Sequence, residues 1–250
     1  MKIGIIGGSG LYELGIDNQG VIPCRNDNPY GDQSAELVKG TIAGVEIVVL
    51  ARHGKDHQFS PSQVNYRANI HALKVENVTH ILATTACGSL RKHLKPGTFV
   101  IPDQFIDFTK FRKNTYHDSF ESGMEHPMMA DPFDDFLCDR IRDAAMDMEL
   151  APESGCTVVS IEGPRFSTRA ESKMFRVWGA DIINMTTATE VSLANEAGIP
   201  YGAIAMVTDF DCWKEDEPLK AWQEILDVFN RNVTIVKDLL VNTVALIGES

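Results

Sequence analysis

The stretch that decides the fold is Tyr201-Gly202-Ala203-Ile204-Ala205-Met206-Val207-Thr208-Asp209-Phe210-Asp211. Its continuous apolar part predicts a strand over Ala203–Val207 that is buried on both faces, as strands of a parallel sheet are. Asp209 and Asp211 follow on alternate positions, and alternate residues of an extended chain point to the same side. The stretch therefore predicts two carboxyl groups that face one space at the end of a buried strand.

The chemistry of such a pair is specific. Two close carboxylates cannot both ionise cheaply, so one is expected to hold a proton near neutral pH. The pair can then donate one hydrogen bond and accept another, which suits a heterocycle that carries a ring nitrogen and an amine. The alternative interpretation is a solvated acidic turn.

Short apolar runs alternate with longer periodic segments along the rest of the chain. The predicted strands are Lys2–Ile6, Glu46–Leu50, His80–Thr84, Thr98–Phe105, Thr157–Ser160, Asp181–Asn184 and Ala203–Val207. The predicted helices are Pro61–Glu76, Asp134–Met148, Thr168–Trp178, Ala188–Ala197 and Leu219–Leu246. This alternation predicts a single α/β domain over residues 1–250.

Three of these helices have recognisable start signals. Ser60-Pro61-Ser62-Gln63 offers a cap, a proline at the first helical position and a glutamine that reaches back. Thr168 with Glu171, and Thr187 with Glu190, have the spacing of a capping box. The polar stretch Asp107–Pro132 is predicted to be a long excursion, and such loops often serve sites.

Composition restricts the partners. The chain has 250 residues, 44% of them hydrophobic, and its 23 basic and 35 acidic residues give a net charge of −12. This charge argues against nucleic acid or an anionic membrane as partner. No apolar run approaches the roughly 20 residues of a membrane span, and the run at the N-terminus is too short for a signal peptide.

The cysteines indicate a reducing compartment. Their number is odd and they form no CxxC pair, at Cys24, Cys87, Cys138, Cys156 and Cys212. The pattern predicts reduced thiols in a cytoplasmic protein rather than a disulfide framework or a zinc site.

A glycine-rich turn follows the first strand. Gly7-Gly8-Ser9-Gly10 would let backbone amides and the Ser9 hydroxyl approach an anion closely. A dinucleotide fold is disfavoured because no third glycine stands at the required spacing. The alternative is a purely structural turn.

Two more strand ends carry polar residues. Arg52 and His53 follow the strand that ends at Leu50; an arginine there can bind phosphate bidentately and the histidine adds a donor. The alternative is a surface salt bridge with a capping histidine. Thr84–Ser89 places hydroxyls and small residues after the next strand. Cys87 within it is interpreted as a buried thiol rather than a nucleophile, since no histidine or aspartate is locally placed to activate it.

The remaining strand ends repeat this theme. In Glu162–Ser167, Phe166 could stack on a flat ring. Asn184-Met185-Thr186 ends another apolar strand in polar and hydroxyl groups. Ligands of open α/β sheets bind at the carboxyl ends of strands, so five such ends predict convergence on one site.

Eight segments together resemble the trimeric purine nucleoside phosphorylases, and most closely their 5'-methylthioadenosine phosphorylase branch. They are Gly7–Gly10, Ala51–Gly54, Val64–Tyr66, Thr84–Leu90, Asp103–Asp107, Glu162–Phe166, Asn184–Thr187 and Thr208–Trp213. The resemblance runs from Lys2 to about Leu246. It implies a phosphorylase/hydrolase-like fold, a single α/β domain whose central mixed β-sheet is partly barrel-like and flanked by helices. It also implies a homotrimer.

The resemblance implies a reaction in which inorganic phosphate attacks the anomeric carbon of a purine nucleoside, with no metal or organic cofactor. The implied phosphate-binding residues are Ser9, Arg52, His53, Thr85, Ala86 and Thr186. The implied base-binding residues are Phe166, Ser167, Asp209 and Asp211, of which the two aspartates are catalytic. The residues implied for the ribose and the 5' group are Met185, His126, Trp222, Ile225 and Leu226. A protonated Asp209 would donate to the leaving base, and Asp211 would orient it or accept from the amine.

Two positions bear on the substrate. The branch that acts on 6-oxopurines typically has Asn at position 209 and Glu at 167, whereas this chain has Asp209 and Ser167. The pair favours a 6-amino base, because the wrong base leaves buried polar groups unsatisfied. His126 is implied to come from a neighbouring subunit. Trp222 stands where small aliphatic residues are typical, and an apolar pocket favours a methylthio group. Arg67 receives no role.

The expected activity is phosphorolysis of S-methyl-5'-thioadenosine in purine and methionine salvage. Three alternatives remain: a phosphorylase for methylthioinosine or other purine nucleosides, a nucleosidase that uses water, and a non-catalytic nucleoside sensor on the same fold.

Overall fold

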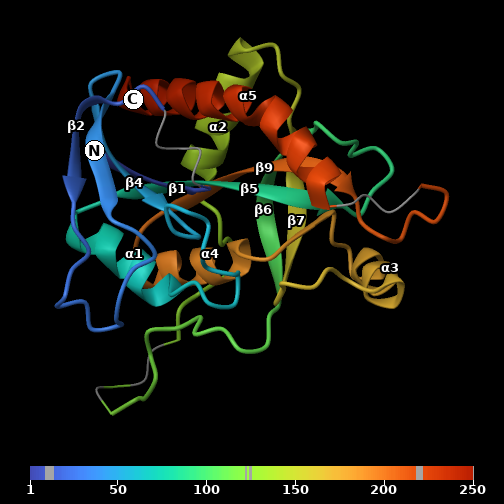
Figure 1. The fold of residues 1–250 in the computed structure, drawn as a ribbon, viewed down its shortest axis with the longest axis horizontal. Helices are drawn as coiled ribbons and strands as arrows, with labels where there is room; N and C mark the ends of the chain where they lie inside the picture. Colours follow the sequence, from blue (N-terminus) through green and yellow to red (C-terminus); the bar gives the residue numbers. More distant parts are fainter. Residues whose placement is uncertain (9–13, 122, 124–125, 218–221, 250) are drawn as a thin grey trace.

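The computed structural model describes residues 1–8, 14–121, 123, 126–217 and 222–249 (Figure 1). The strands are β1 (Lys2–Gly7), β2 (Asp17–Ile22), β3 (Leu37–Ile42), β4 (Val45–Ala51), β5 (His80–Ser89), β6 (Phe99–Phe108), β7 (Glu153–Ile161), β8 (Ile182–Asn184) and β9 (Tyr201–Phe210). The helices are α1 (Tyr66–Val75), α2 (Asp135–Asp147), α3 (Arg169–Val177), α4 (Thr187–Glu196) and α5 (Trp222–Gly248).

These strands form one mixed sheet, in the order β2-β3-β4-β1-β5-β8-β7-β6-β9. β9 pairs with β5 in parallel and also with β6 in antiparallel orientation. The strands β5, β8, β7, β6 and β9 therefore close into a barrel, and β1 to β4 extend from it as an open part. The predicted mixed, partly barrel-like sheet in a single α/β domain is confirmed.

Helices cover both faces of the sheet. In Figure 1, α5 and α2 lie above it, α1 and α4 lie below it, and α3 lies to one side. The strand predicted over Ala203–Val207 is fully buried, with no residue more than 1% exposed. Full burial of such side chains contributes roughly 1.5–3 kcal/mol for each large one. The decisive stretch is thus a core strand that leads directly to the two aspartates.

The helix starts show where local spacing succeeds and fails. Thr168 and Glu171 form the predicted capping box of α3. The predicted start of a helix at Pro61 is wrong: α1 begins at Tyr66, and its cap is Asn65, whose side chain accepts from the Ala68 amide. The residues from Ser60 to Gln63 form a turn instead, closed by the Gln63 amide on the Ser60 carbonyl at 2.9 Å.

The second capping box is also wrong. α4 is capped at Thr186, and that cap makes no side-chain hydrogen bond. Glu190 lies in the first turn of α4 but pairs with Arg52 across the fold. A buried cation binds a carboxylate more strongly than a backbone amide does, so the tertiary partner prevails over the local one.

The open end of the sheet adds two strands that the sequence did not predict. β2 pairs with β3, and β3 with β4, all antiparallel. The long helix α5 matches the predicted C-terminal helix, although its predicted start at Leu219 lies outside the described residues.

Among the described residues, no helix is long and apolar enough to cross a membrane. Nor does this part of the chain gather three His, Cys, Asp or Glu side chains that could hold a metal ion.

Candidate active site

The middle of β5 and the carboxyl ends of β7 and β8 meet around one amide. Asn184 donates from Nδ2 to the hydroxyls of Thr85 at 3.2 Å and Thr187 at 2.5 Å. Its Oδ1 accepts from the Ser160 hydroxyl at 2.7 Å, and the same hydroxyl accepts from the Ala188 amide. The middle of β5, the ends of β7 and β8 and the start of α4 are thereby fixed to one another. The prediction that Thr84–Ser89 follows a strand is wrong, because β5 runs on to Ser89.

Arg52 is held rigidly inside the protein. It is 3% exposed. Its Nε and Nη2 donate to the two carboxylate oxygens of Glu190 at 2.5 and 2.9 Å, and its Nη1 donates to the Thr84 carbonyl at 2.9 Å. The alternative of a surface salt bridge is wrong, because both partners are buried. Nη1 and Nη2 each carry a second N–H that these bonds do not use.

Charge pairing keeps this guanidinium ionised. Burial by itself lowers the pKa of Arg52, but the adjoining Glu190 carboxylate raises that pKa above its ordinary value. Glu190 is not among the residues that the sequence predicts for the site. Its position in the first turn of a helix was the available signal, and it was interpreted as a cap.

His53 is neutral in this environment. Its Nδ1 lies 2.9 Å from the Phe59 carbonyl, and because a carbonyl only accepts, Nδ1 carries the proton. Burial, and then the positive charge of Arg52, lower the pKa of His53 from 6.5 to about 4. The ring stacks on that of His57, with centroids 4.7 Å apart. Near pH 7, Nε2 is therefore an acceptor.

Thr186 carries a buried hydroxyl without a partner. The residue is 4% exposed, and its Oγ1 makes no hydrogen bond within the described part of the chain. It stands at the N-cap of α4, where backbone N–H groups and the helix dipole favour an anion. An unsatisfied buried hydroxyl costs about 1–3 kcal/mol, a cost that an anionic ligand would remove.

The two aspartates differ in environment. Asp211 is 9% exposed, and the Ser167 hydroxyl lies 2.8 and 2.6 Å from its two oxygens. The half-buried Asp209 accepts at Oδ1 from the Thr208 hydroxyl at 2.8 Å. β9 runs on to Phe210, so Asp209 lies in a strand. The alternative of a solvated acidic turn is wrong.

The segment from Glu162 to Ser167 packs on the end of β8. Gly163 has a φ of +68°, and a Cβ there would lie 2.5 Å from the Met185 sulfur. Only glycine therefore fits against Met185 at this point. Phe166, in the same segment, is 53% exposed, so its ring is accessible as a stacking surface.

The other predicted residues are placed as follows. Ala86 is exposed within β5, and Cys87 beside it is a buried thiol, as predicted, with its pKa raised well above its ordinary value by burial. Ile225 is buried on α5. Outside the described part of the chain lie Ser9 and the side chains of Trp222 and Leu226.

His126 stands on the excursion between β6 and α2, which extends away from the body of the molecule (Figure 1). Its ring is exposed and lies 5.4 Å from that of Phe120. Among the described residues, the ring contact with Phe120 does not connect His126 to the residues around Asn184.

Two arginines that the sequence analysis left without a role anchor the excursion. Arg67 donates to Asp118 at 2.6 Å and lies over the Tyr30 ring. Arg112 donates to Glu162 at 2.9 Å. The Glu162 carboxylate also accepts from the Lys110 amide at 2.7 Å, which joins the excursion to the segment that carries Phe166 and Ser167.

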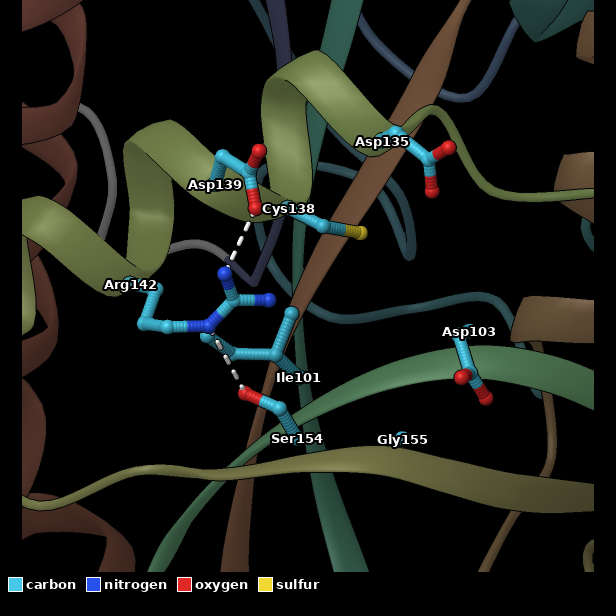
Figure 2. A pocket seen from close by; sticks show the side chains of 8 residues that line it. All are labelled: Ile101, Asp103, Asp135, Cys138, Asp139, Arg142, Ser154 and Gly155. Carbon is cyan, nitrogen blue, oxygen red and sulfur yellow. Dashed lines mark hydrogen bonds and ion pairs between the residues drawn. The ribbon is translucent and has the colours of Figure 1, made fainter.

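A pocket lies elsewhere, between α2, β6 and β7 (Figure 2). It has a volume of about 210 Å³ and is lined by Ile101, Asp103, Asp135, Cys138, Asp139, Arg142, Ser154 and Gly155. Arg142 in its wall pairs with Asp139 at 2.6 Å and contacts Ser154 at 3.4 Å. None of the predicted site residues lines it.

Comparison with known proteins agrees with this geometry. The profile of the phosphorylase superfamily matches residues 2–245. S-methyl-5'-thioadenosine phosphorylase of Xenopus tropicalis is 48% identical over 256 residues, which cover 99% of this chain and 89% of the relative.

Solved structures are equally similar. Methylthioadenosine phosphorylase of Schistosoma mansoni in complex with adenine is 42% identical with a TM-score of 0.91, covering 100% of this chain and 93% of that one. A point mutant of the same enzyme in complex with methylthioadenosine is 42% identical with a TM-score of 0.90. The match covers 100% of this chain and 92% of that one. The chain therefore belongs to the phosphorylase superfamily and, within it, to the family of the S-methyl-5'-thioadenosine phosphorylases.

Proposed function

We propose that the chain catalyses phosphorolysis of S-methyl-5'-thioadenosine to adenine and 5-methylthioribose 1-phosphate, a salvage reaction of purines and methionine in the cytoplasm. The observation that carries the proposal is the buried Asp211 held by Ser167 at the end of β9, next to Asp209. The relatives named above are phosphorylases of this nucleoside, and two of their structures hold adenine or methylthioadenosine.

The base is released between the two aspartates. A phosphate oxygen forms a bond to the anomeric carbon while the bond to the purine breaks, and its electron pair stays on the purine. Asp209 gives its proton to the imidazole-side ring nitrogen and neutralises that charge. Asp211, held by Ser167, accepts from the exocyclic amine or orients Asp209. Phe166 stacks on the ring.

This arrangement favours adenine over hypoxanthine. The Ser167 hydroxyl donates its hydrogen to Asp211. The Ser167 oxygen and the Asp211 carboxylate therefore both present acceptors to the ligand. An exocyclic amine donates to these acceptors, whereas a 6-oxo group places another acceptor at the same position and leaves the acceptor that faces it unpaired.

The proposed phosphate position lies at the ends of β1 and β4, the middle of β5 and the start of α4. Arg52 offers the two N–H groups that Glu190 and Thr84 leave unused, and the buried Thr186 hydroxyl gains a partner. Backbone amides at Thr85 and Ala86, together with Ser9, complete the proposed set. The neutral His53 takes part through Nε2, as acceptor of the proton of hydrogen phosphate.

The sugar packs on Met185, and its methylthio group lies against Ile225 of α5. Trp222 and Leu226 were assigned to the same pocket from the sequence, and their side chains lie outside the described part of the chain. His126 of a neighbouring copy closes this pocket, which makes the active unit a homotrimer. Inorganic phosphate is a co-substrate and no cofactor takes part.

The deciding experiment measures base release from methylthioadenosine and methylthioinosine, each with and without inorganic phosphate. Adenine release that depends on phosphate and exceeds hypoxanthine release supports the proposal. Faster hypoxanthine release overturns the base assignment. Base release without phosphate would identify a nucleosidase. If no base is released from methylthioadenosine, methylthioinosine or adenosine, the protein is a nucleoside sensor.

The Asp209→Asn variant tests the leaving-group step. Because an amide cannot give up a proton, we expect the turnover of methylthioadenosine to fall by about 10²–10⁴. Ser192→Ala is the control, since it removes a hydroxyl that donates to the Ala188 carbonyl of α4 and should leave the turnover unchanged. Unchanged turnover in Asp209→Asn would disprove the role of this residue.

A further inference from the structure

A buried chain of three polar side chains stands behind the proposed phosphate site. Arg52, Glu190 and Tyr201 are 3%, 2% and 1% exposed. Glu190 receives two bonds from Arg52, and its Oε2 also accepts from the Tyr201 hydroxyl at 2.9 Å. Both oxygens of this carboxylate are therefore satisfied, and none of the three groups reaches solvent.

The pairing fixes the guanidinium in more than one direction. Glu190 binds one edge of the guanidinium through Nε and Nη2, and the Thr84 carbonyl holds Nη1 at 2.9 Å. A planar group held on two sides can neither rotate nor slide. Its remaining N–H groups thus have a fixed direction.

Glu190 also belongs to the helix that carries Thr186. The Glu190 amide donates to the Thr186 carbonyl at 3.3 Å, so the two residues lie one helical turn apart on α4. Thr85, the residue after Thr84, accepts from Asn184 beside the same helix start. One set of contacts therefore joins three residues assigned to phosphate, from β4, β5 and α4.

A buried ion pair is a poor device for stability alone. The cost of removing two charges from water can exceed the attraction between them, and apolar replacements are often as stable. An arginine that must remain charged inside the protein to bind an anion needs such a partner, because it would otherwise be uncompensated whenever the anion leaves.

We propose that Glu190 is the positioning residue of the phosphate site and that Tyr201 anchors it. Glu190 aims Arg52 at the phosphate and balances its charge between turnovers, and Tyr201 fixes the carboxylate that does so. Neither residue touches the substrate. This inference rests on the proposed phosphorolysis and assigns a role to two residues outside the set expected to bind ligands.

The test separates phosphate from nucleoside. Tyr201→Phe removes one hydrogen bond and keeps the ring, and we expect its KM for phosphate to rise about threefold. Glu190→Gln places an amide donor against the guanidinium, and we expect its KM for phosphate to rise at least about tenfold. The KM for methylthioadenosine should stay within about twofold in both variants, since neither residue faces the nucleoside.

Two further variants and a direct measurement sharpen the result. Glu190→Asp keeps the charge and should recover part of the affinity for phosphate that Glu190→Gln loses. Asp181→Asn breaks the 2.7 Å ion pair with Arg91 outside the site and should leave the KM for phosphate unchanged. Calorimetric titration of inorganic phosphate into each folded variant, without nucleoside, should follow the same order.

The inference is overturned if phosphate binding is unchanged in folded Tyr201→Phe and Glu190→Gln, or if both KM values rise together. If Glu190→Gln does not fold, Tyr201→Phe and Glu190→Asp decide alone. A wild-type enzyme whose base release needs no phosphate refutes the proposed function instead. These two failures are distinguished before any variant is made.

Discussion

Ser167 shows how one hydroxyl can determine which base a site accepts. This hydroxyl donates its hydrogen to the carboxylate of Asp211, a residue that is 9% exposed. Ser167→Ala should raise the KM for methylthioadenosine by about tenfold, the value of one hydrogen bond to a charged group, and reduce the preference over methylthioinosine. Steady-state kinetics with both nucleosides measures this.

Ser192→Ala, which removes a hydroxyl bonded to the Ala188 carbonyl of α4, is the control and should change neither KM. Equal preference in Ser167→Ala and wild type would contradict the prediction.

His53 links the site to acid stability. Its pKa is lowered from 6.5 to about 4 in the folded chain. Between these values the unfolded chain binds a proton that the folded chain does not, so the free energy of unfolding falls as the pH drops from about 6.5 to about 4. The full shift corresponds to at most about 3 kcal/mol.

Denaturant titrations at pH 7 and pH 4.5 test this. His53→Asn should lose less stability than wild type between the two values. His57, His71 and His80 also have lowered pKa values, so a smaller decline remains in the variant. Equal declines in variant and wild type would show that His53 does not drive the effect.

At the scale of elements, Glu162 connects the excursion to the base-binding segment. Its carboxylate accepts from the amides of Lys110 and Phe111 at 2.7 and 3.1 Å, and from Arg112. These bonds hold the pKa of Glu162 at about 2 against the opposing effect of burial. Glu162→Gln should speed hydrogen exchange at the two amides by about fivefold or more, because a neutral acceptor is weaker.

Glu171→Gln is the matched control for this experiment. Glu171 accepts from the Thr168 amide at 2.7 Å in the capping box of α3. Its loss should speed exchange at Thr168 and leave the amides at 110 and 111 unchanged. Faster exchange at all three positions in both variants would indicate general loosening instead.

The elements also show which features the sequence could reveal. β9 and the capping box of α3 depend on neighbouring residues, and both were predicted. β2 escaped prediction because Asp17, Asn18 and Gln19 are exposed and show no apolar alternation; its place depends on pairing with β3. Glu190 pairs with Arg52, which is far away in the sequence. A pattern of neighbouring residues around Glu190 therefore cannot reveal this partner. Candidate site residues near strand ends could be predicted because polar groups after apolar runs are visible locally.

At the scale of the whole molecule, the proposed homotrimer explains why His126 stands away from the other site residues of its own chain. Sedimentation at micromolar concentration should show three copies. His126→Ala should raise the KM for methylthioadenosine several-fold, about 1 kcal/mol, and leave the KM for phosphate unchanged. Phe111→Ala is the control, since its 84% exposed ring belongs to the same excursion. A fully active monomer would contradict both the assembly and the role of His126.

The closed barrel has a consequence for how the enzyme is made. β5 pairs with β9, so the strand pairing of Ile81 is completed only after Tyr201 has been synthesised. At ribosomal speed this interval is on the order of 10 s. Until then the nascent chain exposes an unpaired apolar strand edge, which is prone to aggregation. Asp209 and Asp211 arrive with the strand that closes this edge. A shortened translation product that lacked β9 would therefore lose both its solubility and its catalytic activity.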